Sequence, residues 1–183
     1  FEKYEAGVTE LANTKIGAVA KKDLSNPRAP EEDPTANSVR SNETELGNLV
    51  TDAMLYKAKD EFPEVQIAFQ NGGGIRAPIA AGDITMGDVF KVLPFGNNPV
   101  IVRITGQELK EVLEFAVRQA PNENGGFLHV AGMKFFYDST REPYDRVVAM
   151  YVVENGDLTP IEMNKEYLAT TNAFTAAGGD GFD

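Results

Sequence analysis

Cysteine is absent from this 183-residue chain, and histidine occurs once. Without cysteine the chain has no disulfide, no thiolate nucleophile and no Cys-ligated metal. The single histidine, His129, cannot build a His-rich dinuclear metal site or a zinc cage. The absence of cysteine fits an exported bacterial protein as well as a cytoplasmic one, so it does not decide the compartment.

Basic residues are also scarce, with 17 Lys and Arg against 28 Asp and Glu and a formal net charge of −11. Nucleic-acid binding needs clustered Lys and Arg that displace counterions, so we expect no nucleic-acid partner. The negative charge disfavours an anionic membrane surface, and no apolar run approaches the roughly 18 residues of a membrane span. A small anionic ligand stays compatible, because a few local arginines can outweigh a diffuse negative surface.

Size and composition are those of one globular domain, with 42% apolar and 25% charged residues. The chain starts at Phe1 without a start methionine or a signal-peptide pattern, and it stops at Asp183. We therefore expect an excised segment of a longer protein.

A strong helix is indicated after residue 42. Asn42 is the expected N-cap, and Glu45 three residues on completes a capping box. Apolar residues then recur at helical spacing and predict one face packed on a core: Leu46, Leu49, Val50, Ala53 and Met54.

Two further helices are expected where Thr-x-x-Asp and Thr-x-x-Glu boxes open residues 85–93 and 105–116, the former ended by Pro94. Ahead of them, residues 1–14 read as a short helix or linker that feeds a strand at 15–20. Residues 25–38 hold three prolines and an acidic run, so we expect an exposed loop.

Strands are indicated by alternating or β-rich apolar residues at 65–69, 100–104, 133–137, 147–153 and 167–171. Helices dominate the first two thirds of the chain and strands the last third. The expected fold class is α+β: a single domain with a mixed β-sheet flanked by helices.

Residues 71–76 (NGGGIR) are the most informative segment. Three consecutive glycines indicate a place where backbone must approach something closely, and Arg76 can offer a guanidinium to a carboxylate or phosphate. A tight strand-end turn with a surface arginine explains the segment equally well. A Walker loop is excluded because no Gly-Lys-Ser/Thr follows, and Pro78 argues against a dinucleotide-binding turn.

Two loops each offer a phenylalanine among small or turn-forming residues. Phe95 lies in residues 93–99 (LPFGNNP), and Phe174 precedes the run GGDG that contains Asp180. Together the two rings could clamp a flat base, and Asp180 could accept a hydrogen bond from a sugar hydroxyl. Against this, a lone loop phenylalanine more often folds back onto the core, and Asp between glycines is a routine turn residue.

His129 has apolar neighbours, so we expect it to be a packed structural residue. The acidic pairs Glu31–Glu32 and Asp180/Asp183 lie in loop or end segments, and nothing marks them as a general acid and base. By itself the chain lacks the parts needed for hydrolysis.

Five motifs in register resemble the C-terminal domain of the 5'-nucleotidase/UDP-sugar hydrolase family, over about residues 38–183. The motifs are Arg40 with LGNL at 46–49, NGGGIR at 71–76, LPFGN at 93–97, GGFL at 125–128, and Phe174 with GGDGF at 178–182.

The resemblance implies an α+β domain that binds a nucleotide and delivers its phosphate to a dinuclear metal centre in a separate N-terminal domain. Phe95 and Phe174 would sandwich the base, and Arg40 and Arg76 would bind the phosphate. Asn71 and Asn97 would hydrogen-bond the base or sugar, Asp180 would hold the ribose hydroxyls, and Gly125, like Gly74, would allow close backbone approach.

In the same comparison, residues 1–14 would be the end of an interdomain linker helix, and residues 15–183 the nucleotide-binding domain. The family's metal-binding signature segments are missing, so this chain should hold no cofactor; two divalent metal ions would belong to the absent N-terminal domain. The expected partners are a nucleotide substrate and that domain, outside the cytoplasm of a bacterium. A third binding arginine known in the family has no secure counterpart, since Arg103 lies on an expected strand.

Two other functions remain open at this point. The chain could be a stand-alone nucleoside-binding module, or a cell-surface interaction module that inherited the fold. Within the family, the motifs do not distinguish nucleoside monophosphates from UDP-sugars, cyclic nucleotides or diadenosine polyphosphates.

Overall fold

The computed structural model describes residues 2–182. Its helices are α1 (Glu2–Asn13), α2 (Glu45–Glu61), α3 (Met86–Val92), α4 (Gly106–Val117) and α5 (Ala173–Ala176), with 3₁₀ turns η1 (Gly72–Gly74) and η2 (Gly179–Gly181). Its strands are β1 (Lys15–Ala20), β2 (Ile67–Asn71), β3 (Gly82–Thr85), β4 (Pro99–Thr105), β5 (Leu128–Ala131), β6 (Met133–Tyr137), β7 (Val147–Glu154), β8 (Asp157–Pro160) and β9 (Glu166–Asn172).

A four-stranded sheet in the order β4–β9–β2–β5 forms the middle of the domain. β2 and β9 run parallel, whereas the other neighbouring pairs are antiparallel, so the sheet is mixed. The expected α+β class, with a mixed sheet flanked by helices, is confirmed. Two smaller antiparallel sheets, β6–β7–β8 and β1–β3, were not expected.

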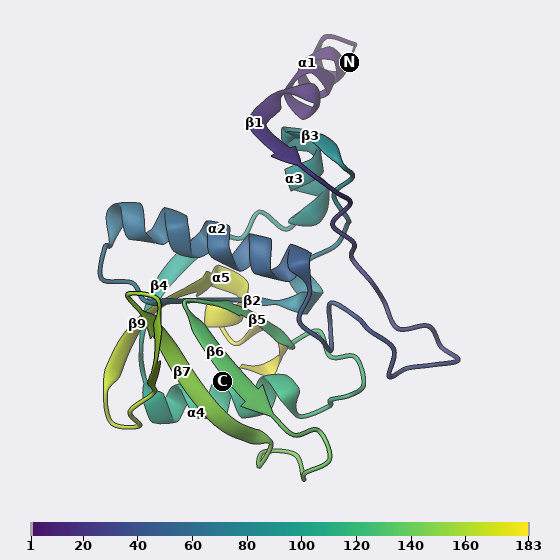
Figure 1. Cartoon of the computed structure of the whole chain (residues 1–183). Coiled ribbons are helices and arrows are strands. Elements are labelled where there is room, and N and C mark those ends of the chain that lie inside the picture. Colours follow the sequence, from purple (N-terminus) through teal and green to yellow (C-terminus); the bar gives the residue numbers. More distant parts are fainter. Residues whose placement is uncertain (1, 183) are drawn as a thin grey trace.

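Helices cover both faces of the central sheet. Leu55 of α2 packs with Ala68 on one face, and Leu113 of α4 packs with Ile67 and Phe69 on the other. This division follows from the strand itself, because successive side chains of β2 point to opposite faces. Met150 of the three-stranded sheet packs in the same core as Leu113 of α4. Figure 1 shows β6 and β7 in front of α4.

A second lobe stands out from this body. Figure 1 shows α1, β1, β3 and α3 together, on the side of α2 that faces away from α4. Ile75, Ile79 and Ile84 form a buried cluster with Leu46 and Val50 of α2, which anchors the lobe to the rest of the domain. No helix within residues 2–182 combines the length and the apolar character needed to cross a bilayer.

The N-termini of three helices test the capping predictions. Thr85 and Thr105 form the expected capping boxes with Asp88 and Glu108. The prediction for α2 is wrong, since Thr44 is its N-cap and accepts a hydrogen bond from the Gly47 amide at 3.1 Å. The side chain of Asn42 is instead engaged by the Ser41 hydroxyl at 2.9 Å.

The predicted apolar face of α2 is only partly right. Leu46 and Val50 are buried, but Leu49 is 41% exposed and Ala53 is also exposed. Leu55 and Ala58 take their place against the sheet. The helix therefore turns an apolar edge toward the open space beside the second lobe.

The expected helix and strand at the N-terminus are present as α1 and β1, and the alternating segments form β2, β4, β6, β7 and β9. Strands β3, β5 and β8 were missed; each is only four residues long. The loop at 25–38 carries no regular helix or sheet, as expected, although its end turns inward and buries Ser38.

Candidate functional site

The three glycines form the turn η1 where β2 ends, and each has a neighbour that leaves little room for a side chain. A Cβ on Gly72 would lie 2.2 Å from the Val39 carbonyl oxygen, and one on Gly74 would lie 2.3 Å from Gln70 Nε2. A Cβ on Gly73 would lie 3.0 Å from the Gly125 carbonyl oxygen. The sequence indicates that something approaches the backbone of this turn closely. In the structure, Val39, Gln70 and Gly125 of the same chain do so.

Residues 123–127 tie Arg40 to this glycine turn. The Asn124 amide donates to the Arg40 carbonyl at 2.9 Å, and the Gly73 amide donates to the Gly125 carbonyl at 2.8 Å. On its other side, the Arg40 amide donates to Ser38 Oγ at 3.0 Å. The backbone that carries Arg40 is thus held at both its N–H and its C=O, beside Gly72.

Asn71 and Asp180 meet across a sequence separation of more than one hundred residues. Asn71 is buried, and its Nδ2 donates to Asp180 Oδ2 at 2.7 Å. Asp180 adopts the left-handed conformation with φ of 58°, which Asp tolerates better than most residues. A Cβ on Gly125 would lie 3.4 Å from Asp180 Oδ1, so three expected site residues lie together here.

The amide of Asn71 is oriented by two buried polar residues that the sequence reasoning did not single out. Gln70 Nε2 and Asn172 Nδ2 both donate to Asn71 Oδ1, at 2.9 and 3.1 Å. Asn172 also caps α5, since its Oδ1 accepts from the Thr175 amide. The signal that could have found them is a run of polar residues at the ends of two otherwise apolar strands.

Phe95 borders an apolar pocket of about 560 Å³ between α2 and the second lobe. Its ring is 60% exposed, and the Arg76 guanidinium carbon lies 5.9 Å from the ring centroid. Gly74 and Asn97 line the same pocket. The exposed Leu49 of α2 forms part of the opposite wall, which explains why this position of the helix is apolar.

Phe174 lies on α5 and is 45% exposed. A Cβ on Gly179 would come within 2.4 Å of its ring, so the small residues after Phe174 make room for the aromatic side chain. The Ala173 amide donates to the Asn98 carbonyl at 2.9 Å, which joins the segments that carry the two phenylalanines. Within residues 2–182 the two rings make no aromatic contact with each other, and neither is buried in the core.

Hydrogen bonds and close packing thus bring the expected site residues together in two connected groups. Arg40, Asn71, Gly125 and Asp180 surround the glycine turn, and Arg76 and Phe95 lie where that turn meets the apolar pocket. Phe174 is linked to the second group through Asn98.

His129 is a packed structural residue, as expected. It is 2% exposed, and its Nε2 bonds the Val39 carbonyl at 2.8 Å. Its Nδ1 has no partner and packs against Gly47, where a Cβ would lie 2.0 Å away. Burial lowers the pKa of His129 below its usual value, which outweighs the opposing effects of the Val39 carbonyl and of Glu43.

The lowered pKa of His129 predicts that acid reduces the stability of the fold. The unfolded chain takes up a proton at His129 near pH 6.5 and the folded chain does so only at a lower pH, so stability is full above about pH 6.5 and decreases as the pH falls. We expect the free energy of unfolding to fall by up to about 1.4 kcal/mol per pH unit below about pH 6.5, until the pH reaches the lowered pKa of the folded state. Urea titrations of wild type and His129→Gln check this, because the variant should lose the slope in this window. The pKa values of Asp88, Glu108 and Asp138 are lowered by hydrogen bonds, so these groups titrate below it.

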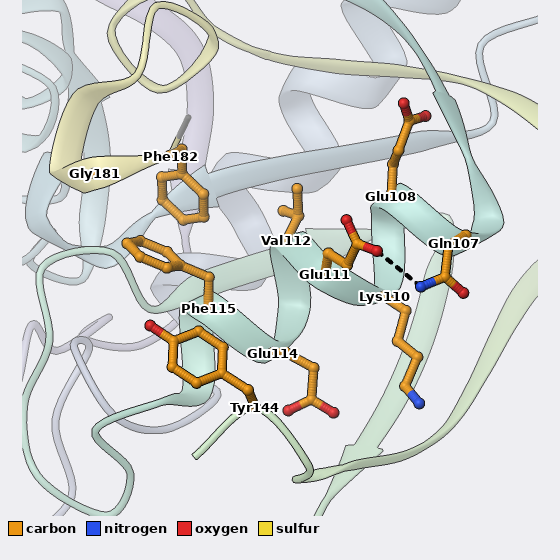
Figure 2. A pocket seen from close by; sticks show the side chains of 10 residues that line it. All are labelled: Gln107, Glu108, Lys110, Glu111, Val112, Glu114, Phe115, Tyr144, Gly181 and Phe182. Carbon is orange, nitrogen blue, oxygen red and sulfur yellow. Dashed lines mark hydrogen bonds between the residues drawn. The ribbon is translucent and has the colours of Figure 1, made fainter.

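A second pocket, of about 530 Å³, lies on α4 and beside Phe182 (Figure 2). Phe182 packs edge-on against Phe115 with ring centroids 4.9 Å apart. Carboxylates that line this pocket are held by hydrogen bonds within the fold. Glu114 accepts from the backbone amides of Arg146 and Val147 at 2.8 and 2.9 Å. Glu111 accepts from Gln107 at 2.8 Å, the bond drawn in Figure 2. Nothing here forms a paired acid and base.

The structure also bears on metal binding. Within residues 2–182, no cluster of three or more His, Cys, Asp or Glu residues could hold a metal ion. Asp183, one of the acidic residues considered above, lies outside the described residues. The donors that a metal centre needs are not assembled in the described part of the chain.

Residues 15–183 match a family model described as the 5'-nucleotidase C-terminal domain. The chain belongs to this family. A trifunctional nucleotide phosphoesterase protein of Bacillus subtilis is 43% identical over 145 residues, which are 79% of this chain and 10% of that protein. The 5'-nucleotidase of Bos taurus is 38% identical over 162 residues, or 82% of this chain and 28% of that protein.

Solved structures agree with this assignment. The 5'-nucleotidase precursor from Thermus thermophilus superposes with a TM-score of 0.87 at 41% identity, over 99% of this chain and 34% of the other. The NAD nucleotidase of Haemophilus influenzae superposes with a TM-score of 0.75 at 29% identity, over 99% of this chain and 32% of the other. This 5'-nucleotidase C-terminal domain therefore spans about a third or less of each of these relatives.

Proposed function

We propose that this chain is the nucleotide-binding domain of a secreted bacterial 5'-nucleotidase, which hydrolyses nucleoside phosphates to nucleoside and phosphate. The observation that carries the proposal is the convergence of Arg40, Asn71, Gly125 and Asp180 on the glycine turn. These residues come from four separate segments, and at this turn the side chains of Asn71 and Asp180 bond each other while the backbone of Arg40 is held beside Gly72. Membership of the 5'-nucleotidase family supports a nucleotide as the ligand.

In this proposal each group has a defined task. Arg40 and Arg76 bind the phosphate through charge-assisted hydrogen bonds. Phe95 and Phe174 hold the base from its two faces, which tolerates any base because every base has a π-face. Phe95 and Phe174 are 60% and 45% exposed, so both side chains are open to a ligand from solution.

The polar groups then orient the sugar and the base. Asp180 keeps Oδ1 for the ribose hydroxyls while Oδ2 is bound by Asn71. Asn71 and Asn97 hydrogen-bond the base or sugar, and Gly125, like Gly74, lets backbone approach the ligand. Gln70 and Asn172 hold the Asn71 amide in place, so that the site does not reorganise when the ligand arrives.

Hydrolysis belongs to another part of the parent protein. The described residues do not fit a dinuclear metal centre, so the two divalent metal ions would be held by an N-terminal metallophosphoesterase domain. Helix α1 would be the end of the linker helix that joins the two domains. Relatives named as snake venom 5'-nucleotidases support a location outside the cytoplasm.

Titration of this chain with adenosine and with AMP tests the proposal. We expect both to bind without phosphate release, because the chain positions the ligand but carries no metal centre. Arg76→Ala should weaken AMP binding by about tenfold, the loss of one charge-assisted hydrogen bond, and leave adenosine unchanged.

Arg103→Ala is the matched control, since Arg103 lies on the edge strand β4 and pairs with Glu166 of β9. It should leave the affinity for both ligands unchanged. A folded chain that binds neither ligand at millimolar concentration would refute the proposal and favour an interaction module. Phosphate release by this chain alone would refute the division of labour between the domains.

A further inference from the structure

Arg28, which no family motif covers, lies at the far end of the glycine turn from Arg40. Its Nη2 faces the Ile75 carbonyl oxygen at 3.5 Å, a distance at which a hydrogen bond is weak. Arg40 borders the other end, where its Cα would lie 3.3 Å from a Cβ on Gly72. Arg76 reaches the Gly73 carbonyl from Nη1 at 3.4 Å. The three guanidinium-bearing residues are thus spread along one short turn.

Loop 25–38 is held where it presents Arg28 to this turn. The carboxylate of Glu123 accepts from the Ala29 amide at 2.9 Å and from the Ser38 hydroxyl. The Val39 amide donates to the Pro27 carbonyl at 3.0 Å, which joins the two ends of the loop. The Glu123 carboxylate therefore holds the backbone next to Arg28 through the Ala29 amide. It also holds the side chain of Ser38, which in turn accepts from the Arg40 amide.

These three arginines differ from the others in their partners. Within residues 2–182, Arg28, Arg40 and Arg76 take part in no ion pair. Arg28 Nη1 and Arg40 Nε are buried without any hydrogen-bond partner. The remaining arginines are engaged by carboxylates or by backbone carbonyls at 2.6–3.0 Å: Arg103, Arg118, Arg141 and Arg146.

A buried guanidinium nitrogen without a partner in the chain is costly unless an ordered water or a ligand supplies the missing acceptor. Within the described residues no carboxylate pairs with these arginines; Glu123 accepts from Ser38 and Ala29, and Asp180 accepts from Asn71. The Arg28 and Arg76 guanidinium groups both lie at carbonyls of this turn, and Arg40 adds a third positive charge on the segment beside it. One phosphomonoester carries roughly −1.5 to −2, so a third arginine leaves charge for a second phosphate.

We propose that Arg28 binds the second phosphate of a nucleoside diphosphate, and so determines the preference of this site between nucleoside diphosphates and monophosphates. The inference rests on the proposed nucleotide-binding function, with Arg40 and Arg76 on the first phosphate. It adds the substrate class and the residue that selects it.

Calorimetric titration of wild type and Arg28→Ala with adenosine, AMP and ADP tests this role. We expect ADP affinity to fall by about 10- to 100-fold, the loss of a charged hydrogen-bond donor, whereas AMP affinity falls by less than about threefold. Adenosine affinity should not change, because adenosine has no phosphate. Arg28→Lys keeps the charge and should recover part of the ADP affinity, and Arg103→Ala should match wild type with all three ligands.

Other outcomes contradict the inference in distinguishable ways. Equal losses for all three ligands would make Arg28 a structural support of the Ile75 turn. Equal losses for AMP and ADP would place it on the first phosphate. Unchanged ADP affinity would remove Arg28 from the site while leaving the proposed function intact, whereas a wild type that binds none of the ligands would refute the proposed function itself.

Discussion

Replacing Phe95 or Phe174 by alanine is expected to weaken AMP binding by about 1–3 kcal/mol, or about five- to 150-fold in Kd. Each ring would contribute one face of stacking, and the two residues are open to solvent, at 60% and 45% exposure. Adenosine should lose the same factor as AMP, because the base is common to both. Titration of each variant with both ligands measures the loss.

Phe62→Ala is the matched control, because Phe62 is 45% exposed like Phe174 but lies at the end of α2. It removes an aromatic ring of equal exposure and should leave both affinities unchanged. Unchanged binding in the Phe95 and Phe174 variants, with melting temperatures close to wild type, would contradict the clamp. The phenylalanines would then be turn residues of two neighbouring loops.

Gly72→Ala is expected to affect both stability and binding. Its Cβ would lie 2.2 Å from the Val39 carbonyl oxygen, and backbone cannot yield as a flexible side-chain end can. Strain of this kind costs about 1–3 kcal/mol of the free energy of unfolding, and occasionally more. Because the displaced segment carries Arg40, AMP affinity should fall with it. Urea unfolding and AMP titration of the same sample measure both effects.

Gly7→Ala is the control for replacing a glycine by alanine where no steric clash results. Gly7 lies inside α1, and nothing is within 4 Å of the position that its Cβ would take. Alanine favours the helix interior by about 0.8–1 kcal/mol over glycine, so this variant should equal or exceed wild type in stability. If Gly72→Ala behaves like Gly7→Ala, the tight contact with Val39 is not what requires glycine at the turn.

The contact between Gly72 and Val39 is the first of a series of close contacts that crosses the domain. Val39 bonds His129 of β5, and His129 packs on Gly47 of α2. This stack leaves no space for a larger residue at either glycine, so the position of Arg40 depends on α2, on β5 and on the glycine turn together. The acid sensitivity predicted for His129 acts on the same stack.

Local signals in the sequence predicted the local structure well. The boxes at Thr85 and Thr105 work because the N-cap and its partner are three residues apart. The same logic failed at Asn42, where Ser41 engages the side chain and the helix begins at Glu45, after Thr44. Strands β3, β5 and β8 were missed because four residues are too few to show an alternation, and only their partners define them.

The binding site itself stays a prediction, and the structure decides only where its residues lie. Arg40, Asn71, Gly125 and Asp180 lie around the glycine turn, and the bonds among them were not foreseen. Asn71 was expected to face a ligand, and in the structure its amide bonds Asp180. Arg28 gave no signal, because an arginine in a proline-rich acidic loop reads as a solvated surface residue. Gln70 and Asn172 were missed for a similar reason, since a polar residue at a strand end is ordinary.

The sequence by itself determined what this domain lacks and which segments carry its chemistry. The absence of cysteine and the single histidine limit the chemistry of the chain, and the glycine and phenylalanine motifs identify the family. Only the tertiary structure decided which side chains share an environment. Contacts such as Asn71 with Asp180, or Arg28 with the Ile75 carbonyl, join residues 109 and 47 positions apart. Such contacts depend on how sheets and helices pack, and no local propensity encodes them.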